Sequence, residues 1–367
     1  MDLDPALPPP LPRPRRPPSR PGPDDPEGPV RARLHGPAEL VAAVPYLIGF
    51  HPRDSLVLLG AQTGDLGIAV TLRLDLADVG SALARREVAA MLAAQGCAAA
   101  FVVVVGGGRA GRSGPPRRRM VAALRDACDA AGISTRAAVW AARTARGAPW
   151  ACYGACRCAG ELPDPACSTV AAATVAAGQV VYADRAELER LVAPGDRAAL
   201  RRRSALLERL LDRAADGAPV TGRAECAVLL ERWVAASASA VPEPTDDDVA
   251  RLALALADPL VRDAAMGYAL GRHAAAAERL WLALVTRLPD PEAAEPAVLL
   301  AHCALMRSDG ALAGAALRRA QRAWPGHRLS ALFQEALARG IGPDELRTWF
   351  AEGHRQAAAM IAEGGPA

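Results

Sequence analysis

Three side chains that could form a hydrolytic centre, His51, Asp54 and Ser55, lie close together in the segment GFHPRDSLVLL. A histidine, an acid and a serine can supply a base, an orienting carboxylate and a nucleophile. Their spacing argues against catalysis, because such residues normally converge from separate segments and the chain has no G-x-S-x-G elbow. The favoured interpretation is a turn, in which Pro52 disfavours helix at His51 and Asp54 or Ser55 satisfies free backbone donors.

Two further polar residues could join this corner from the next β-rich run, GIAVTLRLDL. Thr71, Arg73 and Asp75 alternate along it, so they are expected on one face of a strand. Arg73 and Asp75 could add a charge pair beside the histidine, or they could form the solvated face of the strand. The enzymatic interpretation therefore places its site at a corner made of His51, Asp54, Ser55, Arg73 and Asp75.

A glycine pattern follows the apolar run FVVVV, where Gly106, Gly108 and Gly111 form a literal G-x-G-x-x-G. In a dinucleotide-binding fold the helix begins inside this motif and an acidic residue ends the next strand. Here the helix cannot begin before about Pro115, and no acid follows the next strand. We therefore expect no bound cofactor at this loop. The arginines at 117–119 could receive a phosphate, but a solvated helix start is favoured.

Four cysteines cluster in a loop rich in glycine and proline: Cys152, Cys156, Cys158 and Cys167. Zinc commonly uses paired cysteines two to four residues apart, and a short loop with little core gains stability from such a metal. The C-x3-C-x-C spacing is not a standard knuckle, so free or redox-active thiols are the favoured interpretation. No cofactor is otherwise expected, and zinc remains possible at these four residues.

The elements that must position these residues alternate between helix and strand in the first half. A short helix is expected within 37–48, a β-hairpin from the runs 55–60 and 67–76, helices at 82–95 and 116–131, and strands at 101–105 and about 135–141. Strands separated by helices of this length imply crossover connections. The sequence thus predicts a three-layer α/β domain over residues 34–183, with a mixed, mainly parallel sheet.

The second half, residues 184–367, is predicted to be an all-α domain, because helical patterns fill it between proline and glycine breaks. Two stretches, ending at Pro289 and Pro325, show small residues at matching offsets and resemble a tetratricopeptide helix pair. An abundance of alanine also fits such a template by chance, so a true repeat is left open. One helix–helix contact is expected to bury Ala301, Ala304, Ala313, Leu317 and Ala320.

Composition sets the remaining expectations. The chain has 367 residues with 43 basic and 40 acidic side chains, a balance that lacks the basic excess wanted for nucleic-acid binding. With no apolar stretch long enough to cross a membrane and no leader, we expect a soluble cytoplasmic protein without membrane partners. The proline-rich residues 1–33 are predicted to be a disordered tail.

Several segments together resemble an uncharacterised actinobacterial family, domain of unknown function 4192. They are VPYLIGFHPRDSLVLL at 44–59, RLDL at 73–76, the region of Trp150 and Cys152–Cys158, LWLALVTRLP at 280–289, and LLAHCALMRSDGALAGAALRRAQRAWPGHRL at 299–329. The resemblance covers almost everything after the proline-rich tail. It implies fold and lineage and brings no activity.

Three functional hypotheses follow. The leading one is a non-enzymatic regulatory or scaffold protein whose helical domain binds an unknown protein partner through a tetratricopeptide-like concave face. The alternative is a small-molecule or nucleotide-handling enzyme at the His51 corner, and a third is a metal or redox sensor built on the cysteines. A partner-binding protein should expose an apolar groove on residues 260–340, whereas an enzyme should show a concave pocket at the strand ends.

Overall fold

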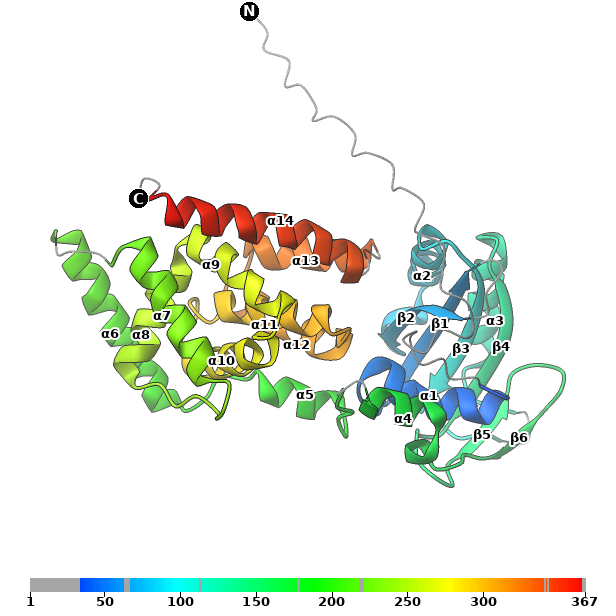
Figure 1. The fold of residues 1–367 in the computed structure, drawn as a ribbon. Helices are drawn as coiled ribbons and strands as arrows, with labels where there is room; N and C mark the ends of the chain where they lie inside the picture. The colour runs from blue at the N-terminus through cyan, green and yellow to red at the C-terminus, as the bar shows by residue number, and fades with distance from the viewer. Residues whose placement is uncertain are drawn as a thin grey trace, which may run out of the picture.

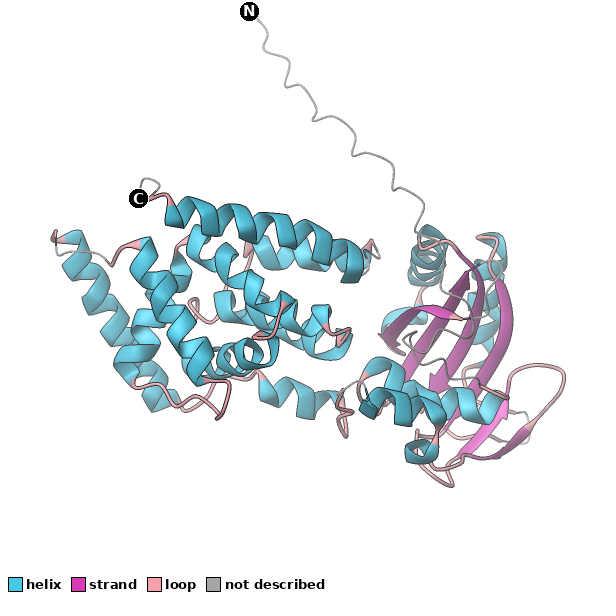
Figure 2. Ribbon diagram, in the orientation of Figure 1, coloured by secondary structure: helices cyan, strands magenta, loops and turns pink. Residues whose placement is uncertain are grey.

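The computed structural model describes residues 34–364 apart from 63–66, 112–113, 177–178, 218–220, 340 and 342. The tail predicted for residues 1–33 and most of the hairpin turn lie outside the described residues. Figure 1 shows an α/β region, followed in the chain by a helical region, with the segment around α4 and α5 between them. Strands occur in the α/β region alone within the described part of the chain, as Figure 2 makes plain.

The α/β region is built around one six-stranded sheet of order β2-β1-β3-β4-β5-β6. Along the chain its elements are α1 (Pro37–Ile48), β1 (Ser55–Gln62), β2 (Ile68–Asp75), α2 (Ala82–Ala94), β3 (Cys97–Val105), α3 (Arg118–Ala130), β4 (Ser134–Ala141), β5 (Pro149–Cys152), β6 (Ala159–Glu161) and α4 (Thr169–Ala176), with 3-10 turns at Asp78–Gly80 and Pro165–Cys167. The expected helices and strands are therefore confirmed up to β4. The short strands β5 and β6 were not predicted, because their three or four residues carry no clear alternation.

The expectation of a mixed sheet is confirmed, but the prediction that it is mainly parallel is wrong. Only β3 and β4, joined by α3, form a parallel pair among the described strands. The strands β2 and β3, joined by α2, also run in the same direction, because each is antiparallel to β1. They are not neighbours, since β1 lies between them. Two strands joined by a helix therefore run in the same direction, as expected, whereas strands joined by short connections pair antiparallel with their neighbours.

Helices cover both faces of the sheet, which confirms the three-layer arrangement. Successive residues of β1 point to opposite faces. On one face Leu56 and Leu58 pack in a core with α2 and α3, and on the other Val57 and Leu59 pack in a core with α1. Arg73 is paired with Val57 across the β1–β2 ladder, so Thr71, Arg73 and Asp75 share the α1 face of the sheet as expected.

The helical region has one continuous core. Its helices are α5 (Arg185–Leu191), α6 (Arg197–Ala215), α7 (Arg223–Ala236), α8 (Asp246–Ala257), α9 (Pro259–Ala265), α10 (Ala274–Arg287), α11 (Ala294–Met306), α12 (Gly310–Ala323), α13 (Arg328–Ala338) and α14 (Pro343–Ala362), with a 3-10 helix at Met266–Leu270. Ala301, Ala304, Ala313, Leu317 and Ala320 are all buried where α11 packs on α12. This confirms the predicted small-residue contact.

The two regions meet where the end of α1 touches the start of α12. Gly49 ends α1 in the left-handed conformation, with φ of 81°, and a Cβ built on it would lie 2.6 Å from the Cβ of Ala311. Glycine is therefore required there by both backbone and space. Next to it, Phe50 forms a β-bridge with Tyr182 from the connecting segment. These contacts place the β2 edge of the sheet beside the first turn of α12.

Candidate functional site

A cavity of about 530 Å³ lies at this junction and is the strongest candidate site. Its walls come from the end of α1, the edge strand β2, the connecting segment before α5, and the first turns of α12. The charged residues that line it are Arg73, Asp75, Asp78, Arg185, Asp309 and Arg318. The sheet supplies one half of the cavity and the helical region the other, so neither region forms it alone.

Three arginines from three elements meet at this cavity and share two carboxylates. The Arg73 guanidinium of β2 lies 2.6 Å from Asp75, which Arg185 of α5 also approaches at 3.4 Å. Arg185 in turn contacts Glu189 at 2.9 Å, and Arg318 of α12 lies 3.4 Å from the same Glu189 oxygen. Alternating cations and anions thus run from the sheet to the helical region, with one more cation than anion in the chain of contacts.

The pKa of Arg318 shows that the neighbouring arginines repel its positive charge. Burial lowers the pKa of its guanidinium, and the charges of Arg185, Arg322 and Arg73 lower the pKa further, while Glu189 raises it. The Nε of Arg318 is buried without a hydrogen-bond partner in the described residues. Like charges gathered in a partly buried site repel one another. A bound anion would relieve that repulsion and accept the unused hydrogen bond.

The structure brings together only part of the corner predicted from the sequence. Ser55 accepts a hydrogen bond from Arg73 Nε at 3.0 Å, and its hydroxyl donates to the backbone oxygen of Arg53 at 2.7 Å. Asp75 pairs with Arg73 and lines the cavity. His51 instead turns to Thr144, with its Nδ1 2.8 Å from the Thr144 backbone oxygen. In the described structure the imidazole and the serine hydroxyl therefore have separate partners.

Asp54 has a structural role that matches the favoured turn interpretation. Its Oδ1 accepts a hydrogen bond from the backbone N–H of Gly107 at 2.7 Å, and its own carbonyl accepts from Leu76 N–H at 2.9 Å. The residue adopts φ of 41°, a left-handed conformation that aspartate tolerates better than most residues. Asp54 thus ties the start of β1 to the loop after β3.

Two side chains of the protein hold the glycine motif in place by hydrogen bonds to its backbone oxygens. Trp140 Nε1 donates to the Gly106 oxygen at 2.7 Å, and Arg117 Nε donates to the Gly107 oxygen at 3.2 Å. The helix α3 begins only at Arg118, after the motif. A smaller cavity of about 290 Å³ lies nearby, lined in part by Arg85, Arg117 and Arg119. Arg85 and Arg117 already donate to backbone carbonyls, so this smaller cavity is the weaker candidate for an anion.

Three of the four clustered cysteines converge. The Sγ atoms of Cys152, Cys156 and Cys158 all lie within 4.8 Å of one another, at the turn between β5 and β6. Cys167 is not in this group, because the chain leaves the turn along β6 before reaching it, so a site made of all four cysteines stays a prediction. Hydrogen bonds from the Cys158 backbone and thiol lower the pKa of Cys156, whereas burial raises the pKa of Cys152.

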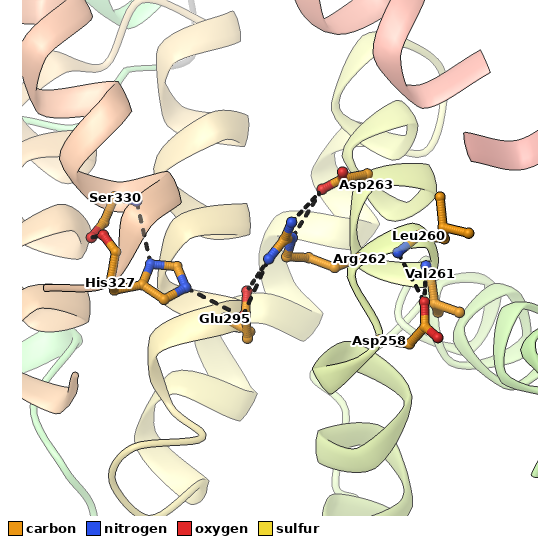
Figure 3. Close-up of polar contacts among 8 residues, drawn as sticks. All are labelled: Asp258, Leu260, Val261, Arg262, Asp263, Glu295, His327 and Ser330. Atoms are coloured by element: carbon orange, nitrogen blue, oxygen red, sulfur yellow. Dashed lines mark hydrogen bonds and ion pairs between the residues drawn. The ribbon is translucent and has the colours of Figure 1, made fainter. Parts of the chain in front are cut away.

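A buried polar network also lies within the helical region (Figure 3). His327 Nε2 lies 3.2 Å from Glu295, and the Arg262 guanidinium lies 3.4 Å from the same carboxylate. Ser330 N–H donates to His327 Nδ1, so the imidazole proton sits on Nε2 and is donated to Glu295. These contacts join α9, α11 and α13 and open onto neither described cavity, which indicates a structural role.

Sequence reasoning missed Arg185, Glu189 and Arg318, although it identified Arg73 and Asp75. No local signal marked the three, because arginine is the only basic residue besides histidine in this chain and occurs throughout it. Their proximity depends on how α5 and α12 pack against the sheet edge. Long-range packing of this kind is not encoded in residue spacing.

Comparison with known proteins gives one result. The family model described as a domain of unknown function (DUF4192) matches residues 37–344. No curated protein and no solved structure matches the chain. Among the described residues, none of the helices combines the length and apolar character needed to cross a lipid bilayer.

Proposed function

Because the chain belongs to the DUF4192 family, whose description names no activity, we propose its function from the junction cavity. The protein is a non-enzymatic regulatory protein that binds a small anionic molecule between its α/β and helical regions. The carrying observation is the convergence of Arg73, Arg185 and Arg318 on one cavity, where they are linked through the carboxylates of Asp75 and Glu189.

The chemistry of the cavity favours a carboxylate or a phosphate. Guanidinium groups present paired N–H donors that match both anions, and such bonds are stronger than those between neutral groups. A volume of about 530 Å³ suits a metabolite rather than a bare ion. The first turn of α12, including Gly310 and Ala311, also lines the cavity, and its N-terminus is capped by Asp309, which accepts the Leu312 N–H at 2.9 Å.

Binding without catalysis is favoured by the partners of the candidate nucleophile. Ser55 is held between the Arg53 carbonyl and the Arg73 guanidinium, so no base is placed to take its proton. His51, the base of the enzymatic alternative, contacts Thr144. An enzyme at the His51 corner would need these contacts rearranged, and it remains the less favoured alternative.

The output of such a regulator would be a protein contact through the helical region. The α11–α12 pair, closed by small residues, supports a tetratricopeptide-like organisation of this region. Two large apolar side chains, Trp324 after α12 and Leu332 in α13, are exposed there, at 47% and 56%. They are where a protein partner would dock. Eight free cysteines in the structure fit the reducing cytoplasm as its location.

Calorimetric titration of the full chain with inorganic phosphate, pyrophosphate, citrate and sugar phosphates tests the proposal. At least one anion should bind saturably, and Arg318→Gln should weaken it at least about tenfold, the cost of one charge-assisted hydrogen bond. The matched control is Arg339→Gln, which removes an exposed arginine paired with Glu335 on α13. Saturable binding by none of the anions, or equal affinity in wild type and Arg318→Gln, would contradict the proposal.

The melting temperature of ligand-free Arg318→Gln provides a second measurement. Arg318 is crowded by three other arginines, so neutralising it should leave the melting temperature unchanged or raise it. Loss of binding without loss of stability separates a ligand-binding role from a structural one.

A further inference from the structure

The turn between β5 and β6 holds three cysteine sulfurs in one place. The Sγ atoms of Cys152, Cys156 and Cys158 lie within 4.8 Å of one another. The turn is closed at its base, where the Cys152 N–H donates to the Cys158 carbonyl at 2.8 Å, next to the Ala151–Ala159 pair of the ladder. The three thiols therefore project from a closed, hydrogen-bonded loop.

The backbone within the turn is bent in a way that costs conformational energy. Arg157, between the last two cysteines, has φ of 49°, in the left-handed region that a side-chain-bearing residue adopts at a cost. A single stretch of extended chain would place alternate side chains ~6 to 7 Å apart. The bend instead holds Cys156 and Cys158 close enough to share one bound atom.

The separation of the sulfurs fits a metal ion after a small adjustment. Zinc binds thiolate at ~2.3 Å, so two sulfurs of a tetrahedral site lie ~3.8 Å apart. The sulfurs, now within 4.8 Å of one another, must therefore approach by at most roughly 1 Å. Cys156 and Cys158 can make this movement, because they are exposed and free to change rotamer. Cys152 is buried beside the sheet and supplies a fixed ligand.

A metal explains the number of sulfurs better than a disulfide does. A disulfide joins two sulfurs and would leave the third without a role, whereas a thiophilic cation uses all three. Cys167, which a four-ligand site would require, stays outside the group. Three protein ligands and one open position are typical of zinc sites that accept an outside ligand.

We infer that Cys152, Cys156 and Cys158 form a trithiolate site for Zn²⁺, with the fourth position filled by water or another outside ligand. Binding converts three thiols into three thiolates and releases three protons, while the oxidation states of metal and sulfur stay unchanged. The β5–β6 turn belongs to the opposite edge of the sheet from β2. This site is therefore independent of the anion cavity, and either proposal can fail without the other.

Cobalt provides a direct test, because Co²⁺ bound tetrahedrally by thiolates has intense charge-transfer and visible bands. The full chain, reduced and handled without oxygen, is titrated with Co²⁺ and then with Zn²⁺, which should displace the cobalt at one equivalent per chain. Cys156→Ser and Cys158→Ser should each weaken Zn²⁺ binding at least tenfold. Cys167→Ser, which changes an exposed cysteine outside the group, is the matched control and should bind as wild type does.

Folding does not confound these variants, since both deciding cysteines are exposed; circular dichroism of the metal-free proteins checks this. The inference is overturned if no thiolate-to-cobalt band appears, or if Cys167→Ser weakens binding as much as the other two substitutions. It is also overturned if freshly isolated protein carries a disulfide within residues 152–158 that excludes metal.

Discussion

At the scale of single residues, the histidine with the largest pKa shift, His302, lines neither proposed site. The ring of His302 is buried against Phe333 and Phe350, at centroid distances of 5.9 and 4.8 Å, and these two phenyl rings stack on each other. Burial lowers its pKa from 6.5 to about 4, and His354 contributes a smaller lowering. A histidine on an apolar helix face is thus kept neutral as part of the core.

This histidine should make the protein less stable in mild acid. Below about pH 6.5 the unfolded chain binds a proton at this histidine that the folded chain does not bind. The free energy of unfolding therefore falls as the pH drops from 6.5 toward 4, and the stabilising contribution of the group is fully present above pH 6.5. The free energy of unfolding in urea should fall by about 2 to 3 kcal/mol from this group between pH 7 and pH 4.5. His302→Leu should remove that part of the pH dependence, and the exposed His35→Leu should leave it. Equal slopes in wild type and His302→Leu would refute the assignment.

Asp54 offers a second prediction at this scale. Asp54→Ala removes the acceptor for Gly107 N–H and leaves alanine in a left-handed conformation, so it should cost about 1 to 2 kcal/mol of unfolding free energy. Asp54→Asn keeps an acceptor oxygen and tolerates the same φ, and should cost less than half as much. Chemical denaturation of both variants measures the loss of unfolding free energy. Similar losses in the two variants would show that the hydrogen bond to Gly107 does not account for the destabilisation.

At the scale of elements, the sequence predicted what depends on local periodicity. The helices α1, α2 and α3, the helical second half, the β1–β2 hairpin, the buried β3 strand and the face shared by Thr71, Arg73 and Asp75 were expected, because alternation and helical spacing report which side is buried. Beyond this hairpin, the order of the strands in the sheet was not predicted. Whether β3 lies beside β1 or beside β2 is decided by long-range pairing, and the cavity arginines of α5 and α12 were missed for the same reason.

The contact between α11 and α12 is the element-scale feature that can be tested directly. Ala313 of α12 is completely buried, and α12 packs against α11. Ala313→Leu should lower stability by about 1 to 3 kcal/mol through overpacking. The control is Ala331→Leu on the exposed face of α13, which should change stability by less than about 0.5 kcal/mol. Thermal melting of the two variants tests the contact, and matching melting curves would show that the helices pack differently.

At the scale of the whole molecule, Gly49 controls how closely the two regions approach. A Cβ there would lie 2.6 Å from Ala311, so Gly49→Ala should separate the end of α1 from α12 and weaken anion binding. Gly36→Ala is a matched control, because Gly36 also has a positive φ, of 144°, but nothing lies within 4 Å of its added Cβ. Small-angle scattering and anion titration should show a change in Gly49→Ala alone. Identical scattering and affinity in the two variants would mean that this contact does not shape the cavity.

The distance in sequence between the cavity walls has a consequence during protein synthesis. Arg73 emerges from the ribosome long before Arg318, and at roughly 5 to 20 residues per second the interval is roughly 10 to 50 seconds. Throughout that time the sheet edge carries its arginine without the helix that completes the cavity. A nascent or truncated chain therefore cannot assemble the proposed anion site. Occupancy of the site would distinguish finished molecules from unfinished ones.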